Sequence, residues 1–416
     1  MPLLPPAPPR RFLFLQGPIS PFFAELAVAL RAHGHATRRI NLCLGDRLFW
    51  DGSGATDYRG RPRDWPDFIA GYLKRERITD LVLLGEQRPY HKAAIAAAKA
   101  RGIAVTVTDY GYLRPDWIVL ERDGMGAESR FPRDPAAILA LAEDCPEPDL
   151  AHLYGDDFAL QARWDVTHHL ASLLPWPFPH YESYLLHHPI PAYLGTGLQL
   201  LRRRAETARA AAVLAALAPR GPLYLFAMQM ENDYSIRAYS RFPDNDTALA
   251  EVVGSFARGA PPDAQLLVKV HPLDPGLKRW AARLGRIAAA AGVAGRVHLL
   301  DGALDADPVI LACRGVVTIN STLAVRAIAL GRATMAMGRA IYDVPGLVWQ
   351  GAPDAFWQVA APPDAVLAEA FIRGIGACLQ VRGRFYGRPG LDAAVRGAMR
   401  RLHLGLLNVP VPEVLV

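Results

Sequence analysis

Two long blocks of the chain alternate short apolar runs with amphipathic stretches. In the first block, the expected β-strands cover residues 11–17, 36–43, 78–86 and 103–111. Helical periodicity, with apolar residues every three or four positions, fills residues 21–34 and 90–102. This alternation is typical of a parallel sheet whose two faces are covered by helices.

The same alternation returns after a long helical stretch at residues 197–221. The segment before that stretch, residues 130–195, is rich in proline, aromatic residues and histidine, which favours helices and long loops. From residue 362 onward the pattern is helical and ends in an irregular tail. Strands of the second block are expected at residues 222–229, 265–272, 296–302, 316–320 and 333–338, with helices between them.

The pattern predicts an α/β protein with two doubly wound Rossmann-type domains that face a cleft, followed by C-terminal helices. We expect an N-terminal domain at 1–196, a linking helix at 197–221 and a second domain at 222–361. Residues 362–416 would form helices and a tail that pack back on the N-terminal domain. Because ligands of such folds bind beyond the carboxyl ends of the strands, polar residues at strand ends are the first candidates for a site.

Composition narrows the function classes. The 416 residues are 51% hydrophobic with a formal net charge of +6, which suits an anionic ligand or membrane face and falls short of a dedicated nucleic-acid binder. Four scattered cysteines form no CxxC pair, so we expect neither a zinc site nor disulfides. The absence of a signal-peptide pattern and of about eighteen successive apolar residues predicts a cytoplasmic protein that touches a membrane at most peripherally.

One strand end stands out at residues 266–275, LLVKVHPLDP, which contain Lys269, His271 and Pro272. Pro272 disfavours a helical conformation at His271, and the two-residue spacing puts Lys269 and His271 on one face of the strand. A cation beside an imidazole suits a phosphate or a carboxylate. A lysine that reaches solvent and a histidine in a hydrogen-bonded turn would give the same pattern.

Another strand end carries Asn320, Ser321 and Thr322 just before a helical pattern. These residue types cap helices, and the free N–H groups at a helix start bind anions. An ordinary cap is the alternative. A doubly wound domain would place this turn on the same sheet edge as His271, which favours an anion site.

The expected strand at 222–229 ends at Gln229, and Glu231, Asp233, Arg237 and Arg241 follow. A carboxylate close to arginines stays ionised, as a nucleophile or base must. A solvated turn with surface ion pairs is the alternative.

Polar residues also follow strands of the first block. Carboxylates among aromatic side chains suit a sugar acceptor, although ordinary loop acids fit as well. The histidines between residues 152 and 188 lack metal-ligand spacing, and we expect no metal site. The acceptor-side candidates are Asp109, Arg114, Asp116 and Glu121, together with Gln16, Gly17, Ser20, Arg88 and His91 after two other strands.

Seven stretches in order make the chain resemble the capsule polysaccharide biosynthesis proteins of Gram-negative bacteria. They are FLQGPISPFF…RINLCLGDRLFW, GEQRPYHKAA, YGYLRPDWIVLE, MQMENDYSIR, LLVKVHPLD, TINSTLAVRAIALG and YDVPGLVW. The resemblance runs from residue 11 to about residue 390 and is to the shorter, single-transferase type. Proteins of that type are retaining β-Kdo transferases that attach the first Kdo of the capsule linker to a phospholipid.

The resemblance implies a GT-B-like pair of domains, CMP-β-Kdo as donor and a lysophosphatidylglycerol-type acceptor at the cytoplasmic face of the inner membrane. It also implies other capsule biosynthesis or export proteins as partners. Asp233 would be the nucleophile that forms a glycosyl adduct, and His271 would bind the CMP phosphate that leaves. The donor side would comprise Gln229, Glu231, Lys269, His271, Pro272, Asn320, Ser321 and Thr322.

One departure concerns the acceptor base. The family commonly has two acids before GYLRP, whereas this chain has Asp109 and Tyr110, so Asp109 would fill that role alone. Lys269, His271 and a helix N-terminus would offset the charge of the departing phosphate, and a carboxylate nucleophile would give retention. We therefore expect neither a metal nor another cofactor.

Two other functions stay open: a transferase for another CMP- or nucleotide-activated sugar, and a non-catalytic scaffold for capsule export. Membrane contact could come from residues 200–209, LLRRRAETAR, or from the tail at 406–416. An interdomain helix and a tail packed on the core are the alternatives.

Overall fold

The computed structural model describes residues 4–155, 157–231 and 233–411. The chain forms two compact units. Unit 1 contains Met1–Phe131, Ala140–Tyr184 and Arg373–Val416, and unit 2 contains Pro132–Leu139 and Leu185–Ile372. The helix expected at 197–221 starts earlier, as α7 (Pro189–Leu217), and lies within unit 2.

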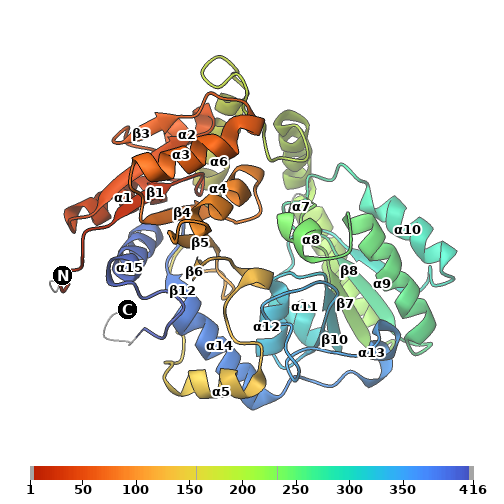
Figure 1. Ribbon diagram of the computed structural model, residues 1–416. Helices are drawn as coiled ribbons and strands as arrows, with labels where there is room; N and C mark the ends of the chain where they lie inside the picture. Colours follow the sequence, from red (N-terminus) through yellow and green to blue (C-terminus); the bar gives the residue numbers. More distant parts are fainter. Residues whose placement is uncertain (1–3, 156, 232, 412–416) are drawn as a thin grey trace. The chain divides into compact units, whose positions relative to one another are not determined.

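Unit 1 is built on a seven-stranded sheet with the order β12-β6-β5-β4-β1-β2-β3 (Figure 1). Strands β1 to β5 pair in parallel, whereas β6 pairs antiparallel with β5 and with β12. The strands are β1 (Arg11–Phe14), β2 (Ala36–Asn41), β3 (Ala55–Asp57), β4 (Asp80–Leu84), β5 (Ala104–Tyr110), β6 (Trp117–Arg122) and β12 (Gln380–Arg382).

Apolar side chains on both faces of this sheet are buried under helices. On one face, α1 (Phe22–Ala32) and α15 (Gly390–Leu404) pack on Phe12 and Phe14. On the other, α3 (Trp65–Arg75) and α4 (Pro89–Lys99) pack on Leu13 and Leu15. Because successive side chains along β1 point to opposite faces of the sheet, this strand contributes to a hydrophobic core on each face. Unit 1 also holds α2 (Leu44–Leu48) and α6 (Phe158–Ser172). The chain passes between the units after residues 131 and 184, and within α5 (Pro135–Glu143) and α14 (Ala365–Leu379).

Unit 2 has a five-stranded, fully parallel sheet with the order β11-β10-β7-β8-β9. Helices α9, α10 and α13 cover one face, and the second half of α7 with α11 and α12 covers the other (Figure 1). The strands are β7 (Leu223–Ala227), β8 (Gln265–Lys269), β9 (Val297–Leu300), β10 (Gly315–Thr318) and β11 (Ala333–Ala336). The remaining helices are α8 (Tyr234–Tyr239), α9 (Asn245–Gly259), α10 (Trp280–Ala290), α11 (Ala306–Ala312), α12 (Leu323–Ala329) and α13 (Pro353–Val359).

The predicted α/β class with parallel sheets is confirmed. In both sheets the five parallel strands have the same spatial order when they are numbered along the chain: third, second, first, fourth, fifth. This order is β3-β2-β1-β4-β5 in unit 1 and β9-β8-β7-β10-β11 in unit 2. In this arrangement the strand order reverses between the first and fourth strands, and ligands bind beyond the carboxyl ends at that switch point. The two switch points lie between β1 and β4, and between β7 and β10. Within the described residues, no helix has the length and hydropathy needed to span a bilayer.

Candidate active site at the ends of β7, β8 and β10

The switch point of unit 2 is bridged by a reciprocal amide pair. Gln229 follows β7 and Asn320 follows β10. The backbone N–H of Asn320 donates to Oε1 of Gln229 at 3.0 Å, and Nε2 of Gln229 donates to Oδ1 of Asn320 at 2.9 Å. The two strand ends that the sequence marked as candidate sites are therefore joined directly.

Asp233 belongs to the same network. Its Oδ1 accepts the backbone N–H of Ser235 at 2.9 Å, which caps α8, and its Oδ2 lies 3.2 Å from Nε2 of Gln229. Ser235 also donates its hydroxyl to Oδ1 of Asn320 at 2.9 Å. The cap and the amide hold the partly exposed carboxylate in one orientation. Ser235 was missed at the sequence level, since its contact with Asn320 spans 85 residues.

The acids and arginines around Asp233 have other partners than the sequence suggested. The guanidinium of Arg237 lies 4.9 Å from the Tyr234 ring centroid, and Arg241 pairs with Glu251. Glu231 pairs with Lys278, which also contacts Asp246 at 2.6 Å. Glu231, a donor-side candidate, is thus part of an ion-pair cluster that ties the loop after β7 to the start of α9 and to the loop before α10.

Lys269 is the last residue of β8 and is only 6% exposed. Burial lowers the pKa of its ammonium group. Among the described residues, none lies within hydrogen-bond or ion-pair distance of that group. Alternation along β8 puts Lys269 on the face of Leu267, where the second half of α7 packs. A buried cation without a protein partner is costly, and an anionic ligand would remove that cost.

His271 follows β8, and its Nδ1 accepts the backbone N–H of Leu273 at 3.1 Å. A ring nitrogen that accepts a hydrogen bond carries no proton, which leaves Nε2 as the nitrogen that can donate. His271 and Pro272 line a small pocket that is open to solvent, together with side chains of α7.

Ser321 and Thr322 form the start of α12. The hydroxyl of Ser321 accepts the N–H of Leu323 at 3.2 Å, while the side chain of Thr322, the capping residue, makes no capping bond. The expected helix start is therefore present, and the Ser321 hydroxyl already accepts one of the N–H groups of that start. Both residues are partly exposed, so their hydroxyls remain within reach of a ligand.

The switch point of unit 1 carries a different network. Gln16, after β1, places Nε2 at 3.2 Å from Oδ2 of Asp46 and 3.4 Å from the hydroxyl of Tyr181. Asp46 also accepts the backbone N–H of Leu42 at 2.8 Å and pairs with Arg39 at 3.5 Å. Gln16, Arg39 and Asp46 are at most 4% exposed. Gln16 therefore serves a buried structural network, and Asp46 was missed because its role appears only in three dimensions.

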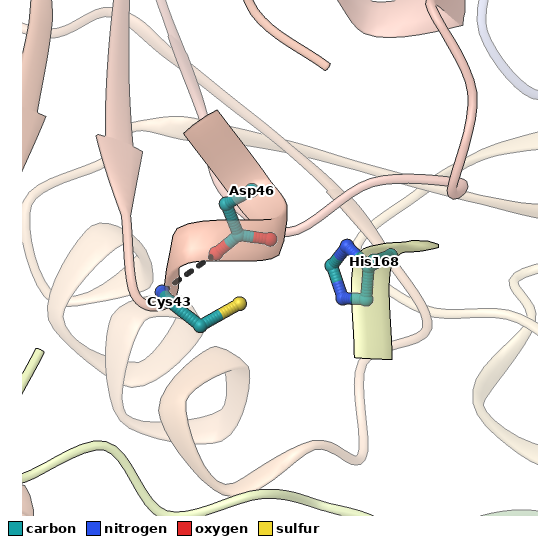
Figure 2. A group of neighbouring side chains, drawn as sticks. All are labelled: Cys43, Asp46 and His168. Carbon is teal, nitrogen blue, oxygen red and sulfur yellow. Dashed lines mark hydrogen bonds between the residues drawn. The ribbon is translucent and has the colours of Figure 1, made fainter. Parts of the chain in front are cut away.

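Three side chains beside this network could converge on a metal ion. Ligand atoms of Cys43, Asp46 and His168 all lie within 4.8 Å of one another, and Figure 2 shows the imidazole edge of His168 facing the other two. Burial and then Asp46 raise the pKa of the Cys43 thiol to about 12. A metal would have to displace that proton beside the Arg39 guanidinium. The residues therefore fit a metal poorly, despite their spacing.

Four further acceptor-side candidates of unit 1 have structural contacts. A Cβ on Gly17 would come within 2.3 Å of the Phe23 ring, so the position requires glycine. Ser20 accepts the N–H of Phe22 at the start of α1. The Arg88 guanidinium lies 4.1 Å from the centroid of the Tyr184 ring. His91 is fully buried and its Nδ1 contacts the Gly85 carbonyl at 2.8 Å; burial, followed by the charge of Arg88, lowers its pKa to about 3.

Two acids near β6 are buried. Asp116 pairs with Arg384 at 2.6 Å; burial alone would raise its pKa, but this pair and two backbone N–H groups lower it. Glu121 accepts the Tyr112 hydroxyl at 2.6 Å, and burial raises its pKa to about 8. Neither carboxyl group is exposed at all. A direct role for either in contacting an acceptor is therefore not supported.

Two candidates at the end of β5 are more accessible. Asp109 is partly exposed, and its Oδ1 accepts the Tyr110 N–H at 2.7 Å. The exposed Arg114 has its guanidinium 5.5 Å from the Tyr110 ring centroid. These two side chains remain candidates on unit 1.

Comparison with known proteins places this arrangement in a family. The family model described as capsule polysaccharide biosynthesis protein matches residues 79–386. The chain belongs to this family. The resemblance of the seven sequence stretches is thus confirmed, and this capsule biosynthesis protein has its Gln229–Asp233–Asn320 network inside the matched region.

Two individual relatives match this sequence over nearly the whole chain. It is 30% identical over 390 residues to the capsule polysaccharide export protein KpsS of Escherichia coli, covering 91% of this chain and 97% of that protein. It is also 30% identical over 397 residues to the capsule polysaccharide modification protein LipB of Neisseria meningitidis serogroup B, covering 91% and 92%. Among solved structures, the beta Kdo 2,7 transferase of Thermosulfurimonas dismutans KpsC has a TM-score of 0.45 at 12% identity, covering 94% of this chain and 99% of that one.

Proposed function

We propose that this capsule biosynthesis protein is a retaining β-Kdo transferase with a GT-B-like fold. It moves Kdo from CMP-β-Kdo to a phospholipid acceptor of the lysophosphatidylglycerol type and so starts the poly-Kdo linker of the capsule. It acts at the cytoplasmic face of the inner membrane beside other capsule proteins. Membership of the capsule family supports this assignment.

The observation that carries the proposal is the set of groups around the second switch point. Lys269 is buried and has no counter-charge among the residues that the structure describes, and the Asp233 carboxylate is held by Gln229 and Ser235. A CMP-ketosugar brings a phosphate and a carboxylate, both anionic. Lys269 offsets one of these charges, and His271 donates a hydrogen bond from Nε2. Asn320, Ser321 and Thr322 supply polar contacts at the end of β10.

The chemistry is a double displacement. A carboxylate oxygen of Asp233 forms a bond to the anomeric carbon while the bond from that carbon to the CMP phosphate oxygen breaks. The acceptor hydroxyl then attacks the same carbon, releases Asp233 and loses its proton to a base, for which we propose Asp109. Two inversions restore the β configuration. The cationic and hydrogen-bonding groups stabilise the leaving phosphate, so no metal or other cofactor enters the scheme.

The test is incubation of the full chain with CMP-Kdo and a fluorescent lysophosphatidylglycerol. We expect CMP release and a product heavier by one Kdo, with the β linkage retained in its NMR spectrum. Release of CMP without a lipid product would mean that the acceptor is not lysophosphatidylglycerol. Thermal stabilisation by UDP or GDP but not by CMP would assign another nucleotide sugar, and the absence of binding and turnover would favour an export scaffold.

A further inference from the structure

The two halves of α7 differ in what they contact. In the second half, Ala210 and Leu217 are buried and belong to the core on one face of the unit 2 sheet. In the first half, the large apolar side chains are exposed, Leu194 at 67% and Leu201 at 84%. Burying such side chains is the main driving force of folding, so a row of exposed ones indicates an unpartnered surface.

The exposed side chains lie on one side of the helix. Ile190, Leu194, Leu198 and Leu201 are exposed and follow one another at spacings of four, four and three residues. Such spacing places side chains in a single stripe, because an α-helix has 3.6 residues per turn. We call these four residues the α7 stripe.

The opposite side of α7 is fixed to the sheet edge. A Cβ on Gly195 would come within 2.3 Å of the Pro275 carbonyl oxygen, and the hydroxyl of Thr207 accepts the Ala303 N–H at 3.0 Å. Gln199 and Arg203 line the pocket that contains His271. Gly195 and Gln199 are five positions beyond Ile190 and Leu194, about 140° around the helix. The α7 stripe therefore points away from the pocket.

The charge pattern of α7 matches an anionic membrane. Residues 189–201 carry no ionisable charge, and the exposed Arg202, Arg203 and Arg204 follow immediately. A helix with an apolar stripe and adjacent arginines lies in the headgroup region, with its arginines on lipid phosphates. The uncharged part is about 20 Å long, too short to cross a bilayer. The apolar stripe is complementary to acyl chains, and the three arginines are complementary to lipid phosphates. An anionic membrane therefore matches both features of α7.

We propose that the first half of α7 docks this protein on an anionic membrane, with the α7 stripe immersed among the acyl chains. Docking would bring lipid headgroups to one side of a helix whose other side lines the His271 pocket. This inference rests on the proposed function only in naming a lipid acceptor; membrane binding itself needs neither donor nor turnover. The tail at 406–416, the other segment suggested by the sequence, lies in part outside the described residues, at 412–416.

The test is co-sedimentation of the full chain with vesicles of equal parts phosphatidylglycerol and phosphatidylcholine, without CMP-Kdo. We expect binding that weakens at high salt and is lost on pure phosphatidylcholine. The double variant Leu194→Gln/Leu201→Gln should lower the vesicle affinity at least about tenfold. Arg202→Gln/Arg204→Gln should lower it on the order of 30-fold at low salt. The control is Leu311→Gln/Val359→Gln, two exposed apolar positions on α11 and α13 of the same unit.

A fluorescent label gives a second readout. All four native cysteines are buried, so a label on Leu201→Cys reports one position, and Leu311→Cys is its control. We expect a blue shift with anionic vesicles at position 201 and none at 311. Equal binding by the leucine double variant and the wild type, or no binding of the wild type, would overturn the proposal. So would a large loss of thermal stability or a change of oligomeric state in the leucine variant, because the stripe would then contact protein. Vesicle binding without Kdo transfer would instead refute only the proposed function.

Discussion

The two sheets share one strand order but use their switch points differently. In unit 1, Gln16 at the end of β1 contacts Asp46, and both side chains are 2% exposed. In unit 2, Gln229 at the end of β7 contacts Asp233 and Asn320, which are both partly exposed. The first network is sealed inside its unit, whereas the second contains the partly exposed carboxylate of Asp233. In the same unit, β8 ends in the buried Lys269, which has no counter-charge among the described residues.

The difference shows that topology locates possible sites without making them active. Both glutamines lie where a doubly wound sheet tends to bind a ligand. In unit 1, the charge of Arg39 already offsets that of Asp46, at 3.5 Å. In unit 2, no described residue offsets the charge of Lys269. The first switch point should therefore respond to mutation through stability, and the second through turnover.

The largest effect is expected for Asp233→Asn. Asparagine keeps the helix cap of α8 but cannot form the glycosyl adduct, so turnover should fall on the order of 10³-fold or more while the fold is kept. Initial rates of CMP release measure the loss, and calorimetric titration with CMP checks that the donor site survives. Turnover close to that of the wild type would exclude Asp233 as nucleophile.

The counterpart in unit 1 is Asp46→Asn. The substitution leaves the Arg39 guanidinium buried without its counter-charge, and we expect a loss of about 3 kcal/mol in the free energy of unfolding. Urea unfolding followed by circular dichroism measures it. Asp51→Asn, which removes a more exposed ion pair with Arg31, is the control and should cost under about 1 kcal/mol. Equal losses in the two variants would mean that the first network is no better sealed than the surface.

Gln229→Ala probes how the second network positions Asp233. It removes the amide that joins Asp233 to Asn320, so we expect kcat to fall roughly tenfold with about 1 kcal/mol lost in stability. Gln358→Ala is the control, because its amide donates to the Gly259 carbonyl at 2.9 Å, away from this network. A kcat as high as that of the control would show that Asp233 needs no orientation by the amide.

A pH effect should come from unit 1. Burial raises the pKa of Glu121 to about 8, above that of an unfolded glutamate. Between these two pKa values the folded state holds a proton on Glu121 that the unfolded state has lost, so the contribution of Glu121 to stability should fall as the pH rises from about 4.5 to 8. Glu121→Gln should flatten this decline, as measured by urea unfolding at pH 5, 6.5 and 8. An unchanged slope would mean that Glu121 is ionised in the fold.

The smallest effect is expected on adding or removing metal. Cys43, Asp46 and His168 have the spacing of a metal site, but burial raises the pKa of the Cys43 thiol to about 12 and Asp46 is paired with Arg39. Dialysis against EDTA, or addition of zinc, should shift the melting temperature by less than about 1 °C and leave CMP release unchanged. A clear zinc-dependent stabilisation that Cys43→Ser removes would turn this network into a metal centre.

Much of the second network could be predicted from local patterns. Gln229 and Asn320 each end an apolar run before a helical pattern, and such strand ends fall on one sheet edge whenever the strands are parallel. What could not be predicted were the partners. Lys278 pairs with Glu231 across 47 residues, and no local pattern indicates that contact.

The errors have similar physical causes. No strand was expected after residue 111 in the first block, yet residues 117–122 form β6, whose antiparallel pairing depends on β5 and β12. Asp116 and Glu121, at the edges of that missed strand, are consequently buried rather than accessible. The start of α7 was placed at residue 197 because Pro189 and Pro191 suggested a loop, although proline is tolerated in the first helical turn.

The most direct test of the central claim is mass spectrometry of the intact protein after incubation with CMP-Kdo in the absence of acceptor. The account predicts a mass gain of one Kdo, located by peptide mapping on Asp233 and absent from Asp233→Asn. An adduct on any other residue, or CMP-Kdo turnover by the wild type that survives unchanged in Asp233→Asn, would contradict it.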